Sequence, residues 1–267
     1  AIDAKAKQLK AQGEDVIGFG TGEPDFNTPD RIKRAGVRAI EENDTHYTPV
    51  GGSNDLKDAI ITKLKRDNGL SYERNQILAS CGAKQSFYNL AQVLWDQGDE
   101  VIIPAPYWVS YPDIVLLSGG NPIIIKCSEN ENFKITPEKL KNSITSKTKW
   151  LILNSPSNPT GSCYSENEIR SLAKILIENK QVHILSDDIY EHITYGKFNF
   201  FTIAQINELK NRTLTMNGVS KSYAMTGWRI GYGAGPVEII KAMAKIQSQS
   251  TTNPSSISQA AAVEALN

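Results

Sequence analysis

Lys221 and Arg229 are the two side chains whose types and spacing most directly suggest chemistry. A run of strand-forming residues, 213–216, leads into a predicted turn at Asn217-Gly218, and Lys221 follows that turn. Arg229 begins a second strand-like run that is rich in glycine. A primary amine can condense with a carbonyl, and a guanidinium can hold a phosphate through two parallel hydrogen bonds. The pair therefore suits a carbonyl compound that carries a phosphate, and pyridoxal 5′-phosphate (PLP) is the obvious one.

The elements around Lys221 predict how such a site is built. The chain has 29 Lys and Arg residues, most of them expected at the surface, so Lys221 gains meaning only from its neighbours. Short apolar runs alternate with helical patterns from residue 75 onward, which predicts an α/β fold with a mostly parallel sheet covered by helices on both faces. In such sheets ligands bind at the carboxyl ends of the strands. Small or polar residues follow the expected strand ends at Gly82-Ala83-Lys84, Tyr107-Trp108, Asn154 to Asn158, Asp187 and Tyr190.

The expected elements are bounded by apolar periodicity and by capping residues. Strands are expected at residues 16–19, 77–80, 101–103, 122–126, 150–153, 182–185 and 213–216, and Thr28, Ser53 and Thr136 are expected to cap helices. The glycines at 18, 20 and 22 do not meet the spacing of a dinucleotide-binding loop, so that fold is rejected. Closely spaced glycines let a backbone approach a ligand, which leaves a substrate contact at Gly22 open.

Each strand-end residue has a chemical use beside a more ordinary one. Asp187 or Asp188 follows an apolar strand and would pair with the pyridinium nitrogen of PLP, or else cap the next segment. Tyr190 and Asn158 can donate to the phenolate oxygen of the ring, or be a half-buried aromatic and a turn residue. Trp108 can stack on the ring or line the surface. The N–H groups of residues 82–84 open a helix, which is a phosphate site beside Arg229 or a plain turn.

Composition excludes several classes of function. The 267 residues carry 29 basic and 29 acidic side chains, so there is no electrostatic footprint for nucleic acid or an anionic membrane. No apolar run reaches the length of a membrane span, and no secretion signal is recognised. The three cysteines lack metal-ligand spacing, so no metal is expected, and they are expected to be reduced thiols in a cytoplasmic protein.

Seven motifs in the same order resemble those of fold-type I, class I PLP-dependent aminotransferases, more narrowly the bacterial aspartate aminotransferase subgroup. They are Gly-Glu-Pro-Asp-Phe (22–26), His-Tyr-Thr-Pro-Val-Gly (46–51), Gly-Ala-Lys-Gln (82–85), Pro-Tyr-Trp-Val-Ser-Tyr-Pro (106–112), Asn-Ser-Pro-Ser-Asn-Pro-Thr-Gly (154–161), Ser-Asp-Asp-Ile-Tyr-Glu-His (186–192) and residues 221–231. The resemblance covers essentially the whole chain. It implies transfer of an α-amino group between an amino acid and a 2-oxo acid by a ping-pong mechanism, with L-aspartate and 2-oxoglutarate favoured.

The resemblance also implies a role at each matching position. Lys221 would form the Schiff base with PLP and shuttle the proton. The pyridinium partner would be Asp187 rather than Asp188. The remaining matches are Tyr190 and Asn158 at the phenolate oxygen, Trp108 as the stacking ring, Gly82, Ala83, Lys84 and Arg229 around the phosphate, and Gly22 at the substrate. Tyr47 matches a tyrosine that reaches the phosphate of the neighbouring subunit, which implies a homodimer.

Two departures from the family pattern are expected to matter. Many relatives have a phosphate-binding serine three residues before the lysine, where this chain has Gly218, and Ser220 and Ser222 are both open as substitutes. The chain stops at Asn267, so we expect residues 1–30 to belong to the small domain and arm, residues 31–267 to form the PLP-binding large domain, and the C-terminal small domain, with the arginine that pairs with the substrate α-carboxylate, to be absent. Two alternatives stay open: another fold-type I PLP enzyme with β-lyase or elimination activity, and a non-catalytic PLP-binding domain.

Overall fold

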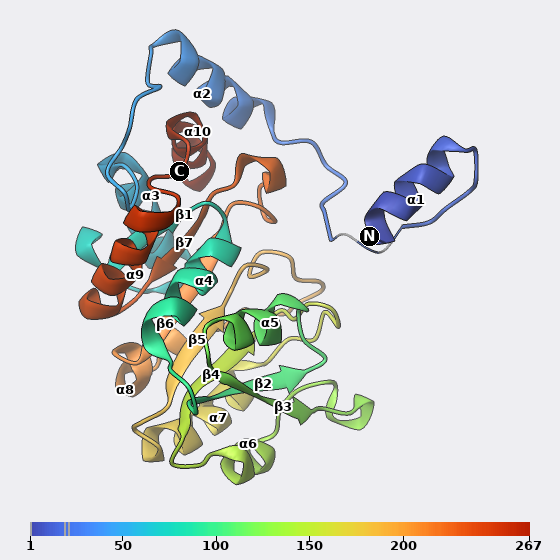
Figure 1. Ribbon diagram of the computed structural model, residues 1–267, viewed down its shortest axis with the longest axis vertical. Helices are drawn as coiled ribbons and strands as arrows, with labels where there is room; N and C mark the ends of the chain where they lie inside the picture. The colour runs from blue at the N-terminus through green and yellow to red at the C-terminus, as the bar shows by residue number, and fades with distance from the viewer. Residues whose placement is uncertain (1, 19, 21) are drawn as a thin grey trace.

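A seven-stranded sheet forms the centre of the computed structural model, which describes residues 2–18, 20 and 22–267 (Figure 1). In the order β1-β7-β6-β5-β4-β2-β3, the strands are β1 Ile77–Ser80, β7 Gly231–Ala234, β6 Thr213–Gly218, β5 His183–Asp187, β4 Thr148–Asn154, β2 Glu100–Ala105 and β3 Asn121–Lys126. Only β7 runs against its two neighbours, and the other pairs are parallel. The carboxyl ends of six strands and the amino end of β7 therefore share one edge of the sheet.

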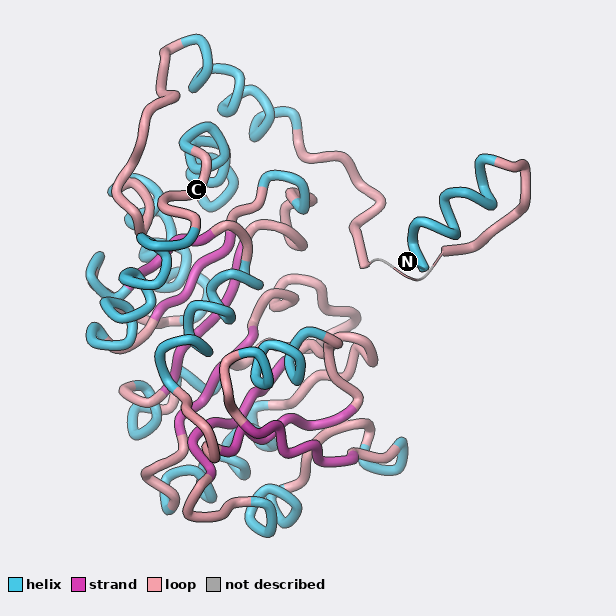
Figure 2. Tube along the Cα trace, in the orientation of Figure 1, coloured by secondary structure: helices cyan, strands magenta, loops and turns pink. Residues whose placement is uncertain are grey.

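The described part of the chain contains ten α-helices. They are α1 Ile2–Ala11, α2 Asp30–Glu41, α3 Asn54–Asn68, α4 Ala83–Leu94, α5 Ser110–Leu117, α6 Pro137–Ser143, α7 Glu166–Glu178, α8 Asn207–Lys210, α9 Val237–Ser250 and α10 Ser256–Leu266. The helix α1 stands apart from the sheet, whereas α2 packs against α10 (Figures 1 and 2).

Side chains alternate along the strands, so each face of the sheet has its own apolar core. In β4, Trp150 and Ile152 pack with α4, α5 and α9, whereas Leu151 and Leu153 pack with α6, α7 and α8. Near β1 and β7, helices α3 and α10 cover the second face. Burying each of these large side chains contributes roughly 1.5–3 kcal/mol to folding. Helices on both faces confirm the predicted α/β class with a mostly parallel sheet.

Caps fix where two of the predicted helices begin. The side chain of Ser53 accepts a hydrogen bond from the backbone N–H of Leu56 at the start of α3, and the side chain of Thr136 accepts one from Lys139 at the start of α6. These caps confirm the expectations for both residues. Thr28 does not cap α2. Its hydroxyl instead donates to the carbonyl of Ala224 at 2.6 Å, which ties the segment before α2 to the loop after Lys221.

Two other local predictions are wrong. The strand expected at residues 16–19 does not form over 16–18, where Ile17 is 79% exposed and no strand lies alongside, and Phe19 lies outside the described residues. The turn expected at Asn217-Gly218 is also absent, because β6 continues through both residues. The side chain of Asn217 donates to Glu191, and Gly218 pairs with Gly231 of β7.

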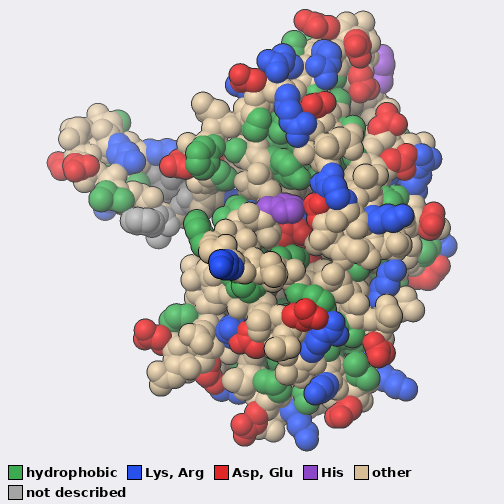
Figure 3. Space-filling view, turned by 180° about the vertical axis from the view of Figure 1, so that it is seen from behind, with side chains coloured by type: hydrophobic (Ala, Val, Ile, Leu, Met, Phe, Trp, Pro, Cys, Tyr) green, Lys and Arg blue, Asp and Glu red, His purple; other side chains and the backbone are tan. Residues whose placement is uncertain are grey.

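The surface agrees with the balanced composition. Basic and acidic side chains are interspersed over the face shown in Figure 3, without one sign dominating it. Among the residues that the structure describes, no helix is both long and apolar enough to cross a membrane.

Candidate active site

A cavity of about 770 Å³ opens at the shared edge of the sheet. Segments that follow β1, β2, β4, β5 and β6 contribute to its wall, together with the segment before β7 and the stretch around Gly22. The polar and aromatic residues in the wall include Lys84, Trp108, Tyr111, Asn154, Asn158, Asp187, Tyr190, Ser220, Lys221 and Arg229. The structure thus brings together the residues that sequence reasoning selected, except Gly82, which lies beside the wall, and Tyr47.

Lys221 lies in the loop that follows β6. Backbone hydrogen bonds close this loop on itself, from Ala224 N–H to the Lys221 carbonyl at 3.2 Å and from Met225 N–H to the Ser220 carbonyl at 3.1 Å. The side-chain amine of Lys221 donates to the carbonyl oxygen of Gly22. Burial lowers the pKa of Lys221, Arg229 adds to that effect, and Glu23 opposes it. A lowered pKa increases the neutral fraction of the amine, which is the nucleophilic form.

Arg229 is held in the cavity wall by its own backbone geometry and by two carbonyls. Its backbone is left-handed, with φ of 55°, which turns the chain sharply into β7. The guanidinium donates to the carbonyls of Thr226 at 2.8 Å and Cys81 at 3.4 Å. The Cα of Gly82 lies so close that a Cβ there would be 2.3 Å from Nη2 of Arg229. Glycine at 82 is therefore needed for the guanidinium to occupy this position.

The helix α4 presents free backbone donors next to this guanidinium. The N–H groups of Ala83 and Lys84 make no hydrogen bond to any described residue, as expected in the first turn of a helix. The N–H of Gly82, in contrast, donates to the Ser80 carbonyl at 2.7 Å. Of the N–H groups of residues 82–84, that of Gly82 is therefore not available to a ligand. Two free N–H groups and one guanidinium form an anion-binding corner.

Asp187 faces the cavity and Asp188 does not. Adjacent residues at the end of β5 point to opposite faces of the sheet. On the face away from the cavity, Asp188 accepts a 2.7 Å hydrogen bond from the Ser186 hydroxyl. Asp187 accepts a hydrogen bond of 2.5 Å from the Tyr111 hydroxyl and one of 3.3 Å from the Ile189 N–H. Burial raises the pKa of Asp187 to about 6, although these two hydrogen bonds lower it. Among the described residues this buried carboxyl has no cationic partner, so it is poised to receive a cationic ligand group.

Asn154 connects Asp187 to the opposite wall of the cavity. Its Nδ2 donates to the backbone carbonyl of Asp187 at 3.0 Å, and its Oδ1 accepts from the backbone N–H of Asn158 at 2.8 Å. The side chain of Asn158 acts on the Tyr190 hydroxyl and lowers the pKa of Tyr190. Burial and the charge of Asp187 outweigh that effect and raise this pKa, so the Tyr190 hydroxyl stays protonated and able to donate.

Trp108 and Tyr111 form an aromatic corner of the cavity. Their rings meet edge to face, with centroids 5.3 Å apart, and Tyr111 also meets Phe87 edge to face at 5.6 Å. The amine of Lys84 lies 4.9 Å from the centroid of the Trp108 ring. These contacts fix the plane of Trp108, so its ring can offer a defined surface for stacking.

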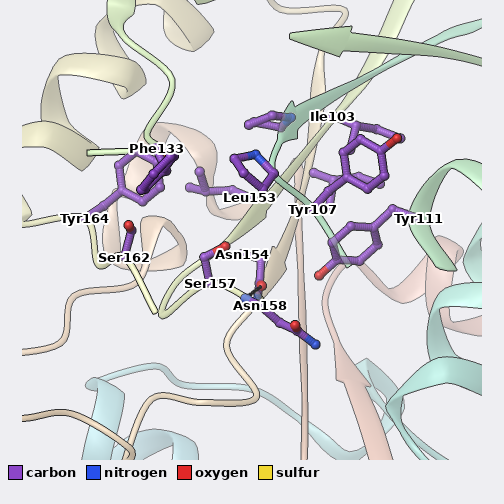
Figure 4. Close-up of a pocket in the computed structure, with 13 residues that line it drawn as sticks. Ile103, Tyr107, Tyr111, Phe133, Leu153, Asn154, Ser157, Asn158, Ser162 and Tyr164 are labelled. Carbon is purple, nitrogen blue, oxygen red and sulfur yellow. Dashed lines mark hydrogen bonds between the residues drawn. The ribbon is translucent and has the colours of Figure 1, made fainter. Parts of the chain in front are cut away.

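A second, smaller cavity lies behind the Asn158 wall (Figure 4). It measures about 20 Å³, which is room for roughly one water molecule. Tyr107, Tyr111, Asn154 and Asn158 border both cavities. Figure 4 shows the ring of Tyr111 at one end of this space, with the rings of Phe133 and Tyr164 at the other. The polar groups of the main cavity are therefore backed by packed side chains.

Sequence reasoning missed the role of Tyr111 and did not distinguish Asn154 from its neighbours. Tyr111 follows Trp108 by three residues, and its N–H donates to the Trp108 carbonyl at 3.0 Å, so one turn brings both rings to the same wall. That spacing was the available signal. Tyr47 lies outside the cavity and is 91% exposed. No group of three His, Cys, Asp or Glu residues suited to a metal ion occurs within residues 2–18, 20 and 22–267.

Comparison with known proteins extends the similarity over the whole chain. The profile of the family described as aminotransferase class I and II matches residues 14–267. A probable aspartate/prephenate aminotransferase of Rickettsia conorii is 57% identical over 268 aligned residues, covering 100% of this chain and 67% of the relative. An aspartate aminotransferase of Bacillus sp. YM-2 is 55% identical, with 100% and 68% covered.

Solved structures give the same picture. The crystal structure of the aspartate aminotransferase from Rhizobium meliloti matches with a TM-score of 0.96 at 53% identity, covering 100% of this chain and 67% of that one. The Thermus thermophilus aspartate aminotransferase with maleate also gives 0.96, at 43% identity, with 100% and 69% covered. The chain thus spans about two thirds of the length of these proteins.

Proposed function

The chain belongs to the class I and II aminotransferases, which are PLP-dependent enzymes, and from that premise we propose that the large cavity is the active site and that Lys221 binds the cofactor covalently. One observation carries the assignment of the site. One cavity is bordered by three kinds of group. They are an amine with a lowered pKa, a corner of anion-binding donors, and a buried carboxyl that has no cationic partner among the described residues. These groups match the carbonyl, phosphate and pyridinium nitrogen of PLP.

The residues present fit the cofactor. The phosphate would lie against Arg229 and the N–H groups of Ala83 and Lys84, with Gly82 leaving room for the guanidinium. Asp187 would bind the pyridinium nitrogen and keep it protonated. In the same proposal, Tyr190 and Asn158 donate to the phenolate oxygen, Trp108 stacks on the ring, and Gly22 and the cavity wall around Trp108 and Asn158 contact the substrate.

The residues of this chain would divide the chemical work. Bound PLP supplies a carbonyl that condenses with amines and a ring that accepts the electrons of the substrate Cα–H bond. Lys221 would hold the cofactor and then take and return a proton at its own Nζ. Among the described residues, Lys84 is the other lysine that borders this cavity. The Asp187 carboxylate would stay ionised beside the cationic nitrogen, since a nearby positive charge lowers the pKa that burial raises.

Substrates follow from the relatives and are part of the proposal. Members of the family act on an amino acid and a 2-oxo acid. We infer L-aspartate as the amino donor, because the similar proteins are named aspartate or aspartate/prephenate aminotransferases. The acceptor would be a 2-oxo acid, with 2-oxoglutarate first and prephenate second.

The same proposal includes a homodimer and a cytoplasmic location. Tyr47 is 91% exposed and reaches no part of the cavity in its own chain, which suits a side chain that completes the phosphate site of a second copy. Cys81, Cys127 and Cys163 are unpaired, as in a reducing compartment. We propose the same division of the chain, with residues 1–30 in the small domain and arm and residues 31–267 in the PLP-binding large domain. The position of α1 apart from the sheet supports this division (Figure 1).

Covalent trapping tests the assignment of Lys221. The protein is loaded with PLP, reduced with borohydride and digested, and the modified peptide is identified by mass spectrometry. We expect the label on Lys221 in the unaltered chain, no stable label in Lys221→Ala, and full labelling in Lys174→Ala, where an exposed lysine of α7 is removed. Label on a different lysine would contradict the proposal. Transfer of the amino group of L-aspartate to 2-oxoglutarate or prephenate is measured on separate portions of the same PLP-loaded proteins, which are neither reduced nor digested.

A further inference from the structure

We propose that Glu191 and Asn217 position Tyr190 relative to Lys221, through one buried hydrogen bond that joins the segments carrying these two site residues. The inference rests on the proposed function and adds two positioning residues that do not themselves border the cavity. It depends on where the backbone pairing of β5 with β6 ends, on the burial of the Glu191 carboxylate and on the attachment of that carboxylate to α3.

The segments that carry Tyr190 and Lys221 separate just before they reach the cavity. The backbone bonds between β5 and β6 end where the N–H of Asp188 donates to the Met216 carbonyl at 2.9 Å. Beyond that bond, no backbone hydrogen bond joins the two segments in the described part of the chain. The sheet alone therefore does not set the distance between the two site residues.

A side-chain hydrogen bond makes the connection that the backbone does not. Nδ2 of Asn217, near the end of β6, donates to Oε1 of Glu191 at 2.6 Å. Glu191 directly follows Tyr190, and Asn217 lies four residues before Lys221. Oδ1 of Asn217 accepts from the N–H of Gly218 at 2.7 Å, so the amide is oriented with its donor toward the carboxylate.

The bond lies on the face of the sheet away from the cavity. Met216 borders the cavity, and the side chain of Asn217 points to the opposite face because it is the next residue of the same strand. Glu191 and Asn217 are only 5% and 3% exposed. A hydrogen bond to a carboxylate in such a buried place is strong, since water does not compete for either group.

The helix α3 gives the Glu191 carboxylate a fixed support. The amine of Lys63 donates to Oε1, and Nδ2 of Asn68 donates to Oε2 at 2.6 Å. Lys63 also donates to Oδ1 of Asn68 at 2.9 Å, which closes a ring of three side chains. Removing the amide of Asn217 leaves this ring intact, so the link to β6 can be tested separately from the ion pair.

The absorption of the PLP-loaded protein reports the position of Tyr190. The covalent link between Lys221 and PLP changes its visible absorption when it takes up a proton, and a hydrogen bond from Tyr190 to the phenolate oxygen lowers the pKa of that link. Asn217→Ala releases the segment that carries Tyr190, so we expect this pKa to rise by about one pH unit in a spectroscopic titration. Asn217→Ser, whose side chain is too short to keep the 2.6 Å bond, should give the same rise with a smaller loss of packing.

A control in the same strand separates positioning from general loosening. Thr213, at the opposite end of β6, is fully buried and donates to the Leu209 carbonyl at 2.9 Å. Thr213→Ala should lower the free energy of unfolding in urea about as much as Asn217→Ala does, but leave the pKa of the Lys221 link unchanged. Neither substitution changes a charge, so a shift of that pKa reports geometry.

A double-mutant cycle tests whether Asn217 acts through Tyr190. Tyr190→Phe removes the donor and should raise the pKa of the Lys221 link by itself. Adding Asn217→Ala to Tyr190→Phe should then produce no further rise, because the group that Asn217 positions is already absent.

Three results would overturn the inference while the proposed function stands. They are an unchanged pKa in both Asn217 variants, an equal shift in Thr213→Ala, and a further rise when Asn217→Ala is added to Tyr190→Phe. If the unaltered chain instead gives no visible band with PLP and no label on Lys221, the proposed function fails and this inference fails with it.

Discussion

The hydroxyl of Tyr111 donates a 2.5 Å hydrogen bond to Oδ2 of Asp187. Tyr111 belongs to α5, which packs on the same face of the sheet as α4 and α9. Tyr111 is only 2% exposed, and it also meets the edge of Trp108. One side chain thus positions the carboxyl that would face the pyridinium nitrogen and the ring that would stack on it. Burial and the charge of Asp187 raise the pKa of Tyr111 far above its ordinary value, so it remains a donor at every working pH.

Removing that hydroxyl should impair the site without unfolding the protein. In Tyr111→Phe the ring contacts remain, but Asp187 loses a hydrogen bond that lowers its pKa. We expect kcat/KM for transamination to fall about tenfold, since a hydrogen bond to a charged group is worth about 1.5–3 kcal/mol and part of it is replaced by water. Tyr72→Phe, at a buried tyrosine away from the cavity, is the control. A Tyr111→Phe enzyme with unchanged kcat/KM would show that the hydrogen bond has no part in catalysis.

Asp187 should make the cofactor-free protein less stable as the pH rises. Its pKa is about 6 in the folded chain and 3.8 when unperturbed, so the folded state holds the proton more tightly. The stabilisation is complete below pH 3.8 and is lost as the pH passes about 6, with a total of about 3 kcal/mol at most. Asp187→Asn should therefore raise the melting temperature of the cofactor-free protein at pH 8 but not at pH 4.

Calorimetry at the two pH values checks this expectation. The same variant should lose most transaminase activity, because an amide cannot balance a pyridinium charge. Asp188 behaves in parallel, as burial raises its pKa to about 7, so its contribution is removed by comparing Asp187→Asn with the unaltered chain under identical conditions. An Asn variant that is less stable at pH 8 would contradict the assignment of a strained, ionised carboxyl.

Asn154 should affect cofactor binding indirectly, through the hydrogen bonds of its side chain to Asp187 and Asn158. In Asn154→Asp, the hydrogen bond from Asn158 N–H survives, whereas the donor to the Asp187 carbonyl becomes a repulsive oxygen. We expect PLP binding to weaken about tenfold and the free energy of unfolding to fall by about 1–3 kcal/mol. Asn154→Ala loses both bonds and should bind PLP more weakly still. Titration with PLP and urea unfolding measure the two effects, and equal affinities in all three proteins would show that the bridge does not position the site.

The sequence predicted which edge of the sheet holds the site, but it did not predict the order of the strands. Apolar runs located every predicted strand from residue 75 onward, because buried parallel strands contain little else. They carried no information on the strand order or on the reversal of β7, which depend on contacts distant in sequence. The strand expected at 16–19 failed for the same reason, since Val16 and Ile17 have strand propensity but no neighbour with which to pair.

Residues that act through another residue were the hardest to predict. Lys221, Asp187 and Arg229 carry charges at strand ends, and their types alone suggest chemistry. Tyr111 is an apolar-looking helix residue until the fold brings it to Asp187, and Asn154 is one of several turn formers until its two hydrogen bonds are seen.

The buried ion pair of Lys63 and Glu191 should contribute more to the free energy of unfolding than an exposed ion pair does. Lys63 and Glu191 pair with exposures of 2% and 3% of their side chains, and Asn217 also donates to Glu191 at 2.6 Å. Glu191→Ala would leave Lys63 buried without its main partner, so we expect a loss of about 3–5 kcal/mol in the free energy of unfolding. The exposed pair of Lys241 and Glu238 is the control, and Glu238→Ala should change stability by less than about 0.5 kcal/mol. Urea unfolding separates the two, and similar losses would contradict the importance of burial.

Gly82 offers the most selective test of the anion-binding corner, because backbone strain and steric clash can be separated there. Gly82 has φ of 87°, and an alanine Cβ would overlap the Arg229 guanidinium at 2.3 Å. Gly98 has φ of 96°, and a Cβ there would meet nothing within 4 Å. Both alanine variants therefore carry similar strain, of about 1–2 kcal/mol, but only Gly82→Ala displaces the guanidinium. We expect Gly82→Ala to weaken PLP binding at least about tenfold while pyridoxal binding changes little, and Gly98→Ala to lower stability by a similar amount with normal affinity for both ligands. If the two variants bind PLP equally well, Arg229 does not need its present position to hold the phosphate, and the corner formed with Ala83 and Lys84 would have to bind it without the guanidinium.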